Sequence, residues 1–414
     1  MVFLFALFLL AACGDSQGTT TDDSSSTSDE TSTDDSTSTD DEATSDGEPI
    51  RIGVVTTLSG PYGEIGQEML DGIQVAVDEA NEAGGVIGRT IELVIEDDEV
   101  QPDVAIRKAE KMVLEEGINL FFGSVASGVT LALQEAMPQW ESLLVTSIPK
   151  SVALTESADN SHFFRVNHND NQDVLTIGHW MKHGDLPYEK FYFVGADYEW
   201  GHDLISEMKA IVEEIGGENL GEEFTPLGTS DYSTVLTNAR SKNPDVIIAA
   251  YAGGDGAAFL SQVHSFGIVD DNIDVVITPM GDSLARANPE LIKGIYGAAN
   301  YHHSLEFEKN ISFVEKFEST HGYKPTNFSG EAYASAWMLF DAIEATNSTD
   351  VNELIATLEG NFTFDSVMGE VEVDPETHQV LHPNYIGEFY ENSETGQSDI
   401  RIIHTVPTED ANPR

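Results

Sequence analysis

Few residue patterns in this sequence could perform covalent or metal chemistry. The chain has no phosphate-binding Gly-x-x-x-x-Gly-Lys-Ser/Thr loop, no His-Glu-x-x-His motif and no Gly-x-Ser-x-Gly turn. His302 and His303 are adjacent, and neighbouring residues on a strand point to opposite faces. We therefore expect no shared metal ion and no cofactor. These patterns favour a binding protein over an enzyme, although a hydrolase built from scattered carboxylates stays open.

The single cysteine, Cys13, cannot form an intramolecular disulfide, so its context decides its use. It follows an apolar stretch at 2–12, which is too short to span a bilayer but typical of a signal peptide. LAAC at 10–13 resembles a lipobox, in which the cysteine carries the lipid. No Lys or Arg precedes the stretch, so the true start could lie upstream. We expect residues 1–13 to be a lipoprotein signal, with a plain secretory signal as the alternative.

Charge is the outlying feature of the composition. The 73 Asp and Glu residues against 19 Lys and Arg give a net charge of −54. Residues 14–48 hold twelve of these acids and no Lys or Arg, which predicts a disordered, extended spacer behind a lipid anchor. The remaining net charge of −42 excludes nucleic acid as a default partner. We interpret it as an adaptation to high salt, where the repulsion between acidic side chains is screened. We expect a monomer on the extracellular face of the membrane, attached by the lipid alone.

From residue 51 the chain alternates short β-branched runs with amphipathic stretches. Strands are predicted at 52–56, 91–95, 120–122 and 143–146, and in a second series at 191–194, 246–250 and 275–277. Helices predicted between them indicate parallel sheets covered on both faces, hence an α/β protein with two doubly wound lobes. Ligands bind beyond the carboxyl ends of such strands. That rule selects the loops 57–62, 123–128, 146–151, 196–201, 251–255 and 278–283.

Several segments in and between these loops match one family in order and spacing. They include RIGVV at 51–55, LSGP at 58–61, GGVIG at 84–88, DYS at 231–233 and VMGEV at 367–371. On these residues the chain resembles the leucine/isoleucine/valine-binding proteins, which are type I periplasmic binding proteins of ABC importers. The resemblance implies two lobes joined by a crossing hinge, which close on a solute and deliver it to a permease driven by a separate ATPase. It places residues 49–167 with 299–362 in lobe 1 and 168–298 with 363–414 in lobe 2.

The resemblance also implies which residues hold an amino acid. In lobe 1 these are Ser127, Thr146 and Ser147, whose hydroxyls and nearby backbone groups would hold the carboxylate and the ammonium. In lobe 2, Trp200 and Tyr251 would contact the solute, and Asp282 would pair with the ammonium. The 147–151 loop departs from the family by carrying Pro149 and Lys150. Amides, urea and small organic acids therefore remain alternative solutes, and a sensory receptor remains an alternative function.

Each of these residues also has an ordinary structural explanation. Ser127 could cap the helix that follows it. Thr146 and Ser147 could bond backbone groups at the strand end, while Trp200 and Tyr251 could be core aromatics. Asp282 could be a solvated charge. For Lys150, which could contact an anionic solute, we prefer a solvated surface position.

Overall fold

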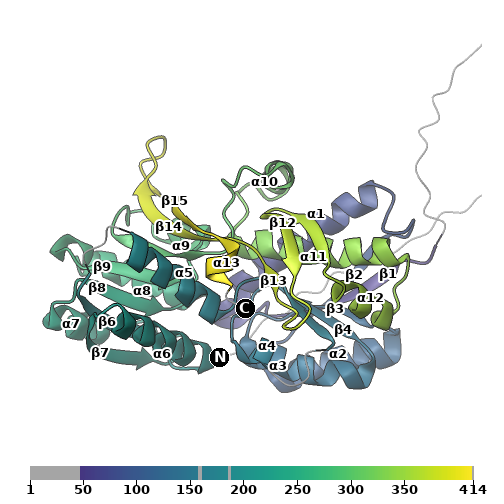
Figure 1. The fold of residues 1–414 in the computed structure, drawn as a ribbon, viewed down its shortest axis with the longest axis horizontal. Coiled ribbons are helices and arrows are strands. Elements are labelled where there is room, and N and C mark those ends of the chain that lie inside the picture. Colours follow the sequence, from purple (N-terminus) through teal and green to yellow (C-terminus); the bar gives the residue numbers. More distant parts are fainter. Residues whose placement is uncertain (1–46, 157–160, 185–187, 413–414) are drawn as a thin grey trace, which may run out of the picture. The chain divides into compact units, whose positions relative to one another are not determined.

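The computed structural model describes residues 47–156, 161–184 and 188–412, which lie in a compact unit of residues 44–414 (Figure 1). The predicted signal peptide, Cys13 and residues 14–46 of the spacer lie outside the described residues. The described part of the chain contains no helix that is long and apolar enough to cross a membrane.

The first lobe is built on a five-stranded parallel sheet with the order β2-β1-β3-β4-β5. Its strands are β1 (Ile50–Thr56), β2 (Ile91–Asp97), β3 (Leu120–Gly123), β4 (Leu143–Thr146) and β5 (Phe163–Arg165). Its helices are α1 (Gly63–Glu82), α2 (Pro102–Glu116), α3 (Ser127–Ala136), α4 (Ala153–Glu156), α10 (Glu308–His321), α11 (Asn327–Thr346) and α12 (Val351–Leu358). Apolar side chains on both faces of the strands explain why both faces are covered by helices.

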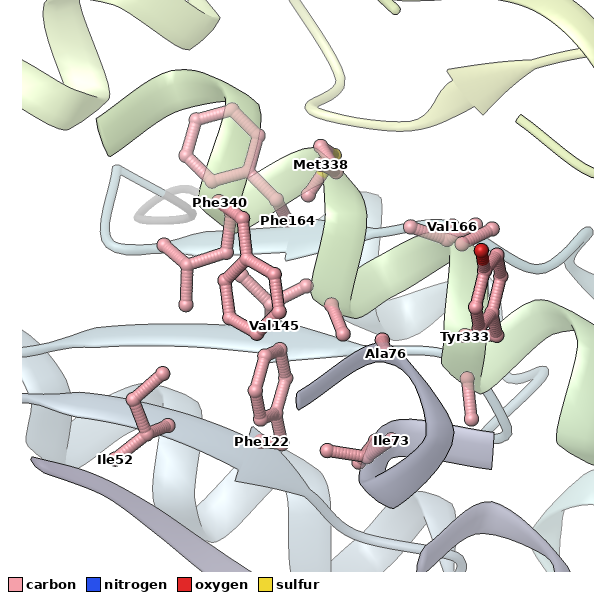
Figure 2. Packing of buried hydrophobic residues seen from close by; sticks show 14 of the residues in the cluster. Ile52, Ile73, Ala76, Phe122, Val145, Phe164, Val166, Tyr333, Met338 and Phe340 are labelled. Carbon is pink, nitrogen blue, oxygen red and sulfur yellow. The ribbon is translucent and has the colours of Figure 1, made fainter. Parts of the chain in front are cut away.

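The two faces of this sheet have separate cores. Ile52, Val54 and Phe122 pack against α1 and α11, whereas Val55 and Phe121 pack against α2 and α3. Figure 2 shows side chains of the first core, from the strands and from both α1 and α11. Helix α11 lies far along the chain from α1 and from these strands, so this core joins segments that are distant in sequence.

The second lobe is built on a seven-stranded sheet with the order β15-β14-β10-β9-β8-β6-β7. Its strands are β6 (Lys190–Ala196), β7 (Glu218–Thr225), β8 (Val246–Ala250), β9 (Asp274–Thr278), β10 (Ile295–Ala299), β14 (Asn384–Glu391) and β15 (Ser398–Val406). Its helices are α5 (Asp170–His183), α6 (Glu199–Glu214), α7 (Ser233–Lys242), α8 (Gly253–Ser265), α9 (Asp282–Ala287) and α13 (Thr408–Ala411). Strands β6 to β10 are parallel, and β14 and β15 add antiparallel pairs. Successive residues of β6 enter opposite cores: Phe191 and Phe193 face α5 and α6, and Tyr192 and Val194 face α7 and α8.

The chain passes between the lobes after β5, after β10 and before β14. Before the last passage lies a small antiparallel sheet of β11 (Thr363–Ser366), β12 (Gly369–Val373) and β13 (Val380–Leu381). Its apolar residues, among them Phe364 and Val371, are buried in the first lobe's core. This placement differs from the predicted boundary at residue 363, because the buried side chains of the small sheet face the first lobe.

Candidate functional site

A cleft lies where loops of both lobes meet. It encloses about 420 Å³ of space between protein atoms, including the part open to solvent. The residues that line it are Tyr62, Ile65, Val125, Ala126, Ser127, Ile148, Pro149 and Lys150 from the first lobe, Tyr198, Trp200, Ala252 and Pro279 from the second, and Phe328 at the start of α11. Most of these residues follow the carboxyl end of a strand, as the strand-end rule predicts.

Aromatic rings form much of the cleft wall. The ring centroids of Tyr62 and Tyr198 are 6.5 Å apart across the two lobes, and those of Tyr198 and Trp200 are 5.8 Å apart. Burial raises the pKa of Tyr62 to about 12, so its hydroxyl stays protonated and can donate a hydrogen bond at neutral pH. The buried Trp200 Nε1 has no hydrogen-bond partner among the described residues. A partner for this N–H is the kind of contact that a polar solute could supply.

Ser127 lies at the cleft, and its position excludes the helix-capping explanation. Helix α3 begins at Ser127, its N-cap residue is Ala126, and no side chain caps it. The buried Ser127 Oγ instead accepts a hydrogen bond of 3.3 Å from the backbone N–H of Ser151. The uncapped first turn of α3 therefore leaves backbone N–H groups and a partial positive charge at the cleft, which suits an anionic group.

The loop before Ser127 is held by the buried carboxylate of Asp98. This side chain accepts hydrogen bonds from Thr57 Oγ1, at 2.7 Å, and from Ser124 Oγ. Asp98 thereby ties the ends of β1 and β3 together beneath the cleft. No pattern in the sequence predicted this role of Asp98.

Thr146 and Ser147 are buried but do not line the cleft. Thr146 Oγ1 and Ser147 Oγ have no hydrogen-bond partner in the described part of the chain, so neither bonds the strand-end backbone there. The cleft surface of this loop comes from the next three residues, Ile148, Pro149 and Lys150.

Tyr251 is a core residue in this structure. It is fully buried, its hydroxyl lies 3.1 Å from Thr225 Oγ1, and its ring packs against Tyr232 and Phe259 at centroid distances of 5.2 and 4.9 Å. The neighbouring Ala252 lines the cleft in its place. The end of β8 thus reaches the site, but the phenol points into the second lobe.

Asp282 is neither solvated nor part of the cleft lining. It is 6% exposed, and its Oδ1 faces His303 Nδ1 at 3.3 Å and His302 Nε2 at 3.5 Å. Burial alone would raise the pKa of this carboxyl, but the two imidazoles outweigh burial and hold the pKa well below its usual range. The expectation that adjacent histidines diverge is wrong, because both lie beyond the end of β10, where a turn begins at His303.

The prediction of a solvated Lys150 is also wrong. Its side chain is 4% exposed, and its Nζ forms a 2.7 Å ion pair with Asp173, which lies in α5 and is fully buried. Lys150 Nζ also donates to Asn300 Oδ1 at the end of β10. Asp173 lies in the first turn of α5, where an acidic residue is common, so nothing local in the sequence marked it as a partner for Lys150.

A second ion pair between the lobes is made by Glu68 of α1. Arg286 of α9 donates to Glu68 Oε1 at 2.7 Å, and Thr326 Oγ1 donates to Glu68 Oε2 at 3.0 Å. The guanidinium also lies 5.0 Å from the ring centroid of Tyr323. Burial raises the pKa of Glu68 to about 7 in spite of the favourable charge of Arg286. This bridge contributes to the contact between lobes in the observed arrangement.

Comparison with known proteins gives a consistent picture. A family model described as "Periplasmic binding protein" matches residues 49–394. Leu/Ile/Val-binding protein homolog 2 of Brucella abortus is 24% identical over 345 residues, covering 82% of this chain and 90% of the relative. Leu/Ile/Val-binding protein BraC3 of Rhizobium johnstonii is 28% identical over 219 residues, covering 52% and 58%.

Solved structures share the fold. An ABC transporter substrate-binding protein from Sphaerobacter thermophilus superposes with a TM-score of 0.79 at 24% identity, covering 87% of this chain and 98% of that chain. A solute-binding protein of an ABC transporter from Rhodopseudomonas palustris BisB5, in complex with 3,4-dihydroxybenzoic acid, gives a TM-score of 0.80 at 22% identity, with the same coverage. These comparisons confirm the predicted two-lobed α/β fold.

Proposed function

Because the chain belongs to the periplasmic binding protein family, we propose that it captures a branched-chain or related amino acid between its two lobes and delivers it to an ABC importer. Proteins of this family bind solutes and do not transform them, so the chain is a binding protein and not an enzyme. The family acts outside the cytoplasmic membrane, which agrees with the expected extracellular position.

The observation that carries the proposal is the composition of the cleft. The uncapped first turn of α3 offers N–H groups on one side, and Trp200 Nε1 and the Tyr62 hydroxyl offer further donors beside apolar rings. A carboxylate attached to an apolar body fits such a surface. Ser127 and Trp200 are the predicted site residues that we retain as direct contacts.

A small aromatic acid is the second candidate solute. Four aromatic side chains line the cleft, and the Rhodopseudomonas relative binds 3,4-dihydroxybenzoic acid. Such a ligand has a carboxylate for α3 and a ring for Tyr62, Tyr198 and Trp200. It would need no partner for an ammonium group, and the lining residues include no carboxylate.

We further propose that Cys13 carries a lipid and that the acidic spacer separates the binding lobes from the membrane. The partners are then a permease and an ATPase encoded by other genes. A sensory role would need the same cleft but a different partner. Permease and ATPase genes beside this gene favour transport, whereas a neighbouring receptor gene favours sensing.

The test is thermal unfolding of the full-length protein against amino acids, aromatic acids, amides and urea. A solute present at a hundred times its dissociation constant stabilises the folded state by about 2.7 kcal/mol. Trp200→Ala removes a hydrogen-bond donor to the solute, worth about 0.5–1.5 kcal/mol, so we expect up to roughly tenfold weaker binding. Tyr251→Phe is the control and should bind with unchanged affinity, because Tyr251 lies outside the cleft. Equal affinities for wild type and Trp200→Ala would refute the proposed contact.

A further inference from the structure

Three side chains converge on one point beside the cleft. Asp282 Oδ1 lies 3.3 Å from His303 Nδ1 and 3.5 Å from His302 Nε2, and the three ligand atoms lie within 4.8 Å of one another. The side chains of Asp282, His302 and His303 are 9%, 3% and 9% exposed. They come from α9 and from the connection between β10 and α10, so the sequence separates them by about twenty residues.

The two histidine nitrogens that face Asp282, and the second oxygen of its carboxylate, lack the hydrogen bonds that buried polar atoms normally make. Asp282 Oδ2, His302 Nε2 and His303 Nδ1 are all buried without a hydrogen-bond partner in the residues that the structure describes. A charge-assisted hydrogen bond from an imidazole to a carboxylate would measure about 2.7–2.9 Å. The observed separations are longer than that, so neither contact has the length of a charge-assisted hydrogen bond.

Metal coordination does account for these distances. Zinc binds imidazole nitrogen and carboxylate oxygen at about 2.0–2.2 Å, and tetrahedral angles then put two ligand atoms roughly 3.3–3.5 Å apart. Two imidazoles and one carboxylate are also a ligand set that suits this ion. The measured 3.3 and 3.5 Å agree with that spacing.

The local backbone explains how neighbouring histidines reach one ion. Strand β10 ends at Ala299, and His303 and Ser304 lie in a turn, so the alternation of a strand does not apply. The ring of His302 is held through Nδ1 by Ser304 Oγ at 2.7 Å, which leaves Nε2 facing Asp282. Holding the far ring nitrogen in this way orients metal-binding histidines.

We propose that Asp282, His302 and His303 bind one divalent transition-metal ion, with zinc as the probe. Three protein ligands leave a fourth position for water. The site lies near the cleft but outside its lining: Gly281, which precedes Asp282, packs against Asn327, and the next residue, Phe328, lines the cleft. The proposal is independent of the solute, because its ligands are not among the proposed solute contacts.

The experiment is titration calorimetry of the full-length protein, purified without a histidine tag, with zinc chloride and no solute. We expect one tight site per chain, and cobalt(II) should give the intense visible absorption of a four-coordinate ion. Outer-shell changes already cost metal sites about 10- to 100-fold in affinity, so loss of the ligand in His303→Ala should cost more than about 100-fold. His202→Ala is the matched control, because His202 pairs with Asp197 at 2.8 Å on the exposed surface; it should leave the tight site intact.

A second histidine cluster supplies the competing outcome. His179 lies 3.2 Å from His404 and 3.7 Å from Asp410, and Asp410 is half exposed. If His404→Ala abolishes tight zinc binding and His303→Ala does not, the proposal is overturned. Absence of tight binding in the wild type also overturns it. Circular dichroism shows whether each variant folds, and Asp282→Asn provides a second ligand change should His303→Ala fail to fold. Solute binding is measured separately, so either proposal can fail alone.

Discussion

Lys150→Met should reveal how much the buried ion pair between the lobes contributes to stability. Lys150 Nζ and Asp173 Oδ2 are 2.7 Å apart, and their side chains are 4% and 0% exposed. Methionine keeps most of the apolar stem of lysine but removes the charge. Among the residues that the structure describes, Asp173 then retains neutral hydrogen-bond donors, including Thr278 Oγ1 at 3.0 Å and Asn300 Nδ2 at 2.9 Å.

The expected cost follows from leaving a buried carboxylate without its counter-charge. Breaking a buried pair on one side costs about 3–5 kcal/mol, because the remaining charge cannot be solvated. For a folded unit of about 370 residues, the entropy of unfolding near the midpoint is roughly 0.8 kcal/mol/K. The loss therefore corresponds to a decrease in Tm of about 4–6 °C.

A double-mutant cycle in urea separates the pair from the individual side chains. Asp173→Asn should cost a similar amount, because it leaves Lys150 charged and buried. Lys150→Met with Asp173→Asn should cost less than the sum of the single changes by at least about 2 kcal/mol, since no lone charge remains. Additive costs, or a Lys150→Met change below about 1 kcal/mol, would refute this account.

Two further predictions test burial and packing. Burial raises the pKa of Glu331 to about 8, so the folded state holds a proton that the unfolded state releases near pH 4.5. Wild-type stability should therefore fall between about pH 5 and 8, relative to Glu331→Gln, by up to about 1.4 kcal/mol per pH unit. If the urea midpoints of the two proteins change in parallel with pH, this prediction is contradicted. Gly72→Ala should destabilise the protein by about 1–3 kcal/mol, because the added Cβ would overlap the Ser329 carbonyl where α1 meets α11. Gly128→Ala is the control, since a Cβ there meets open space, and it should be neutral or slightly stabilising. Equal urea midpoints for the two variants would contradict the packing argument.

The cleft lies at loops that the sequence selected, but only some of the expected residues line it. Ser127 and Trp200 line the cleft, whereas Thr146, Ser147, Tyr251 and Asp282 do not. The strand-end rule gives the loops, because parallel strands carry their carboxyl ends to one edge. It does not give the direction of each side chain. Tyr251 immediately follows β8, yet its ring turns into the core.

The sequence by itself determined the fold class, the two-lobed organisation and the family. Alternating strands and helices, together with segments such as LSGP at 58–61, report local periodicity and turns, which are properties of neighbouring residues. The tertiary structure decided which polar groups are buried and with what partners. Lys150 meets Asp173 and Asn300, and Asp282 meets His302 and His303, only after separate segments pack together. Burial and pairing depend on contacts between distant segments, and a local pattern carries no information about them.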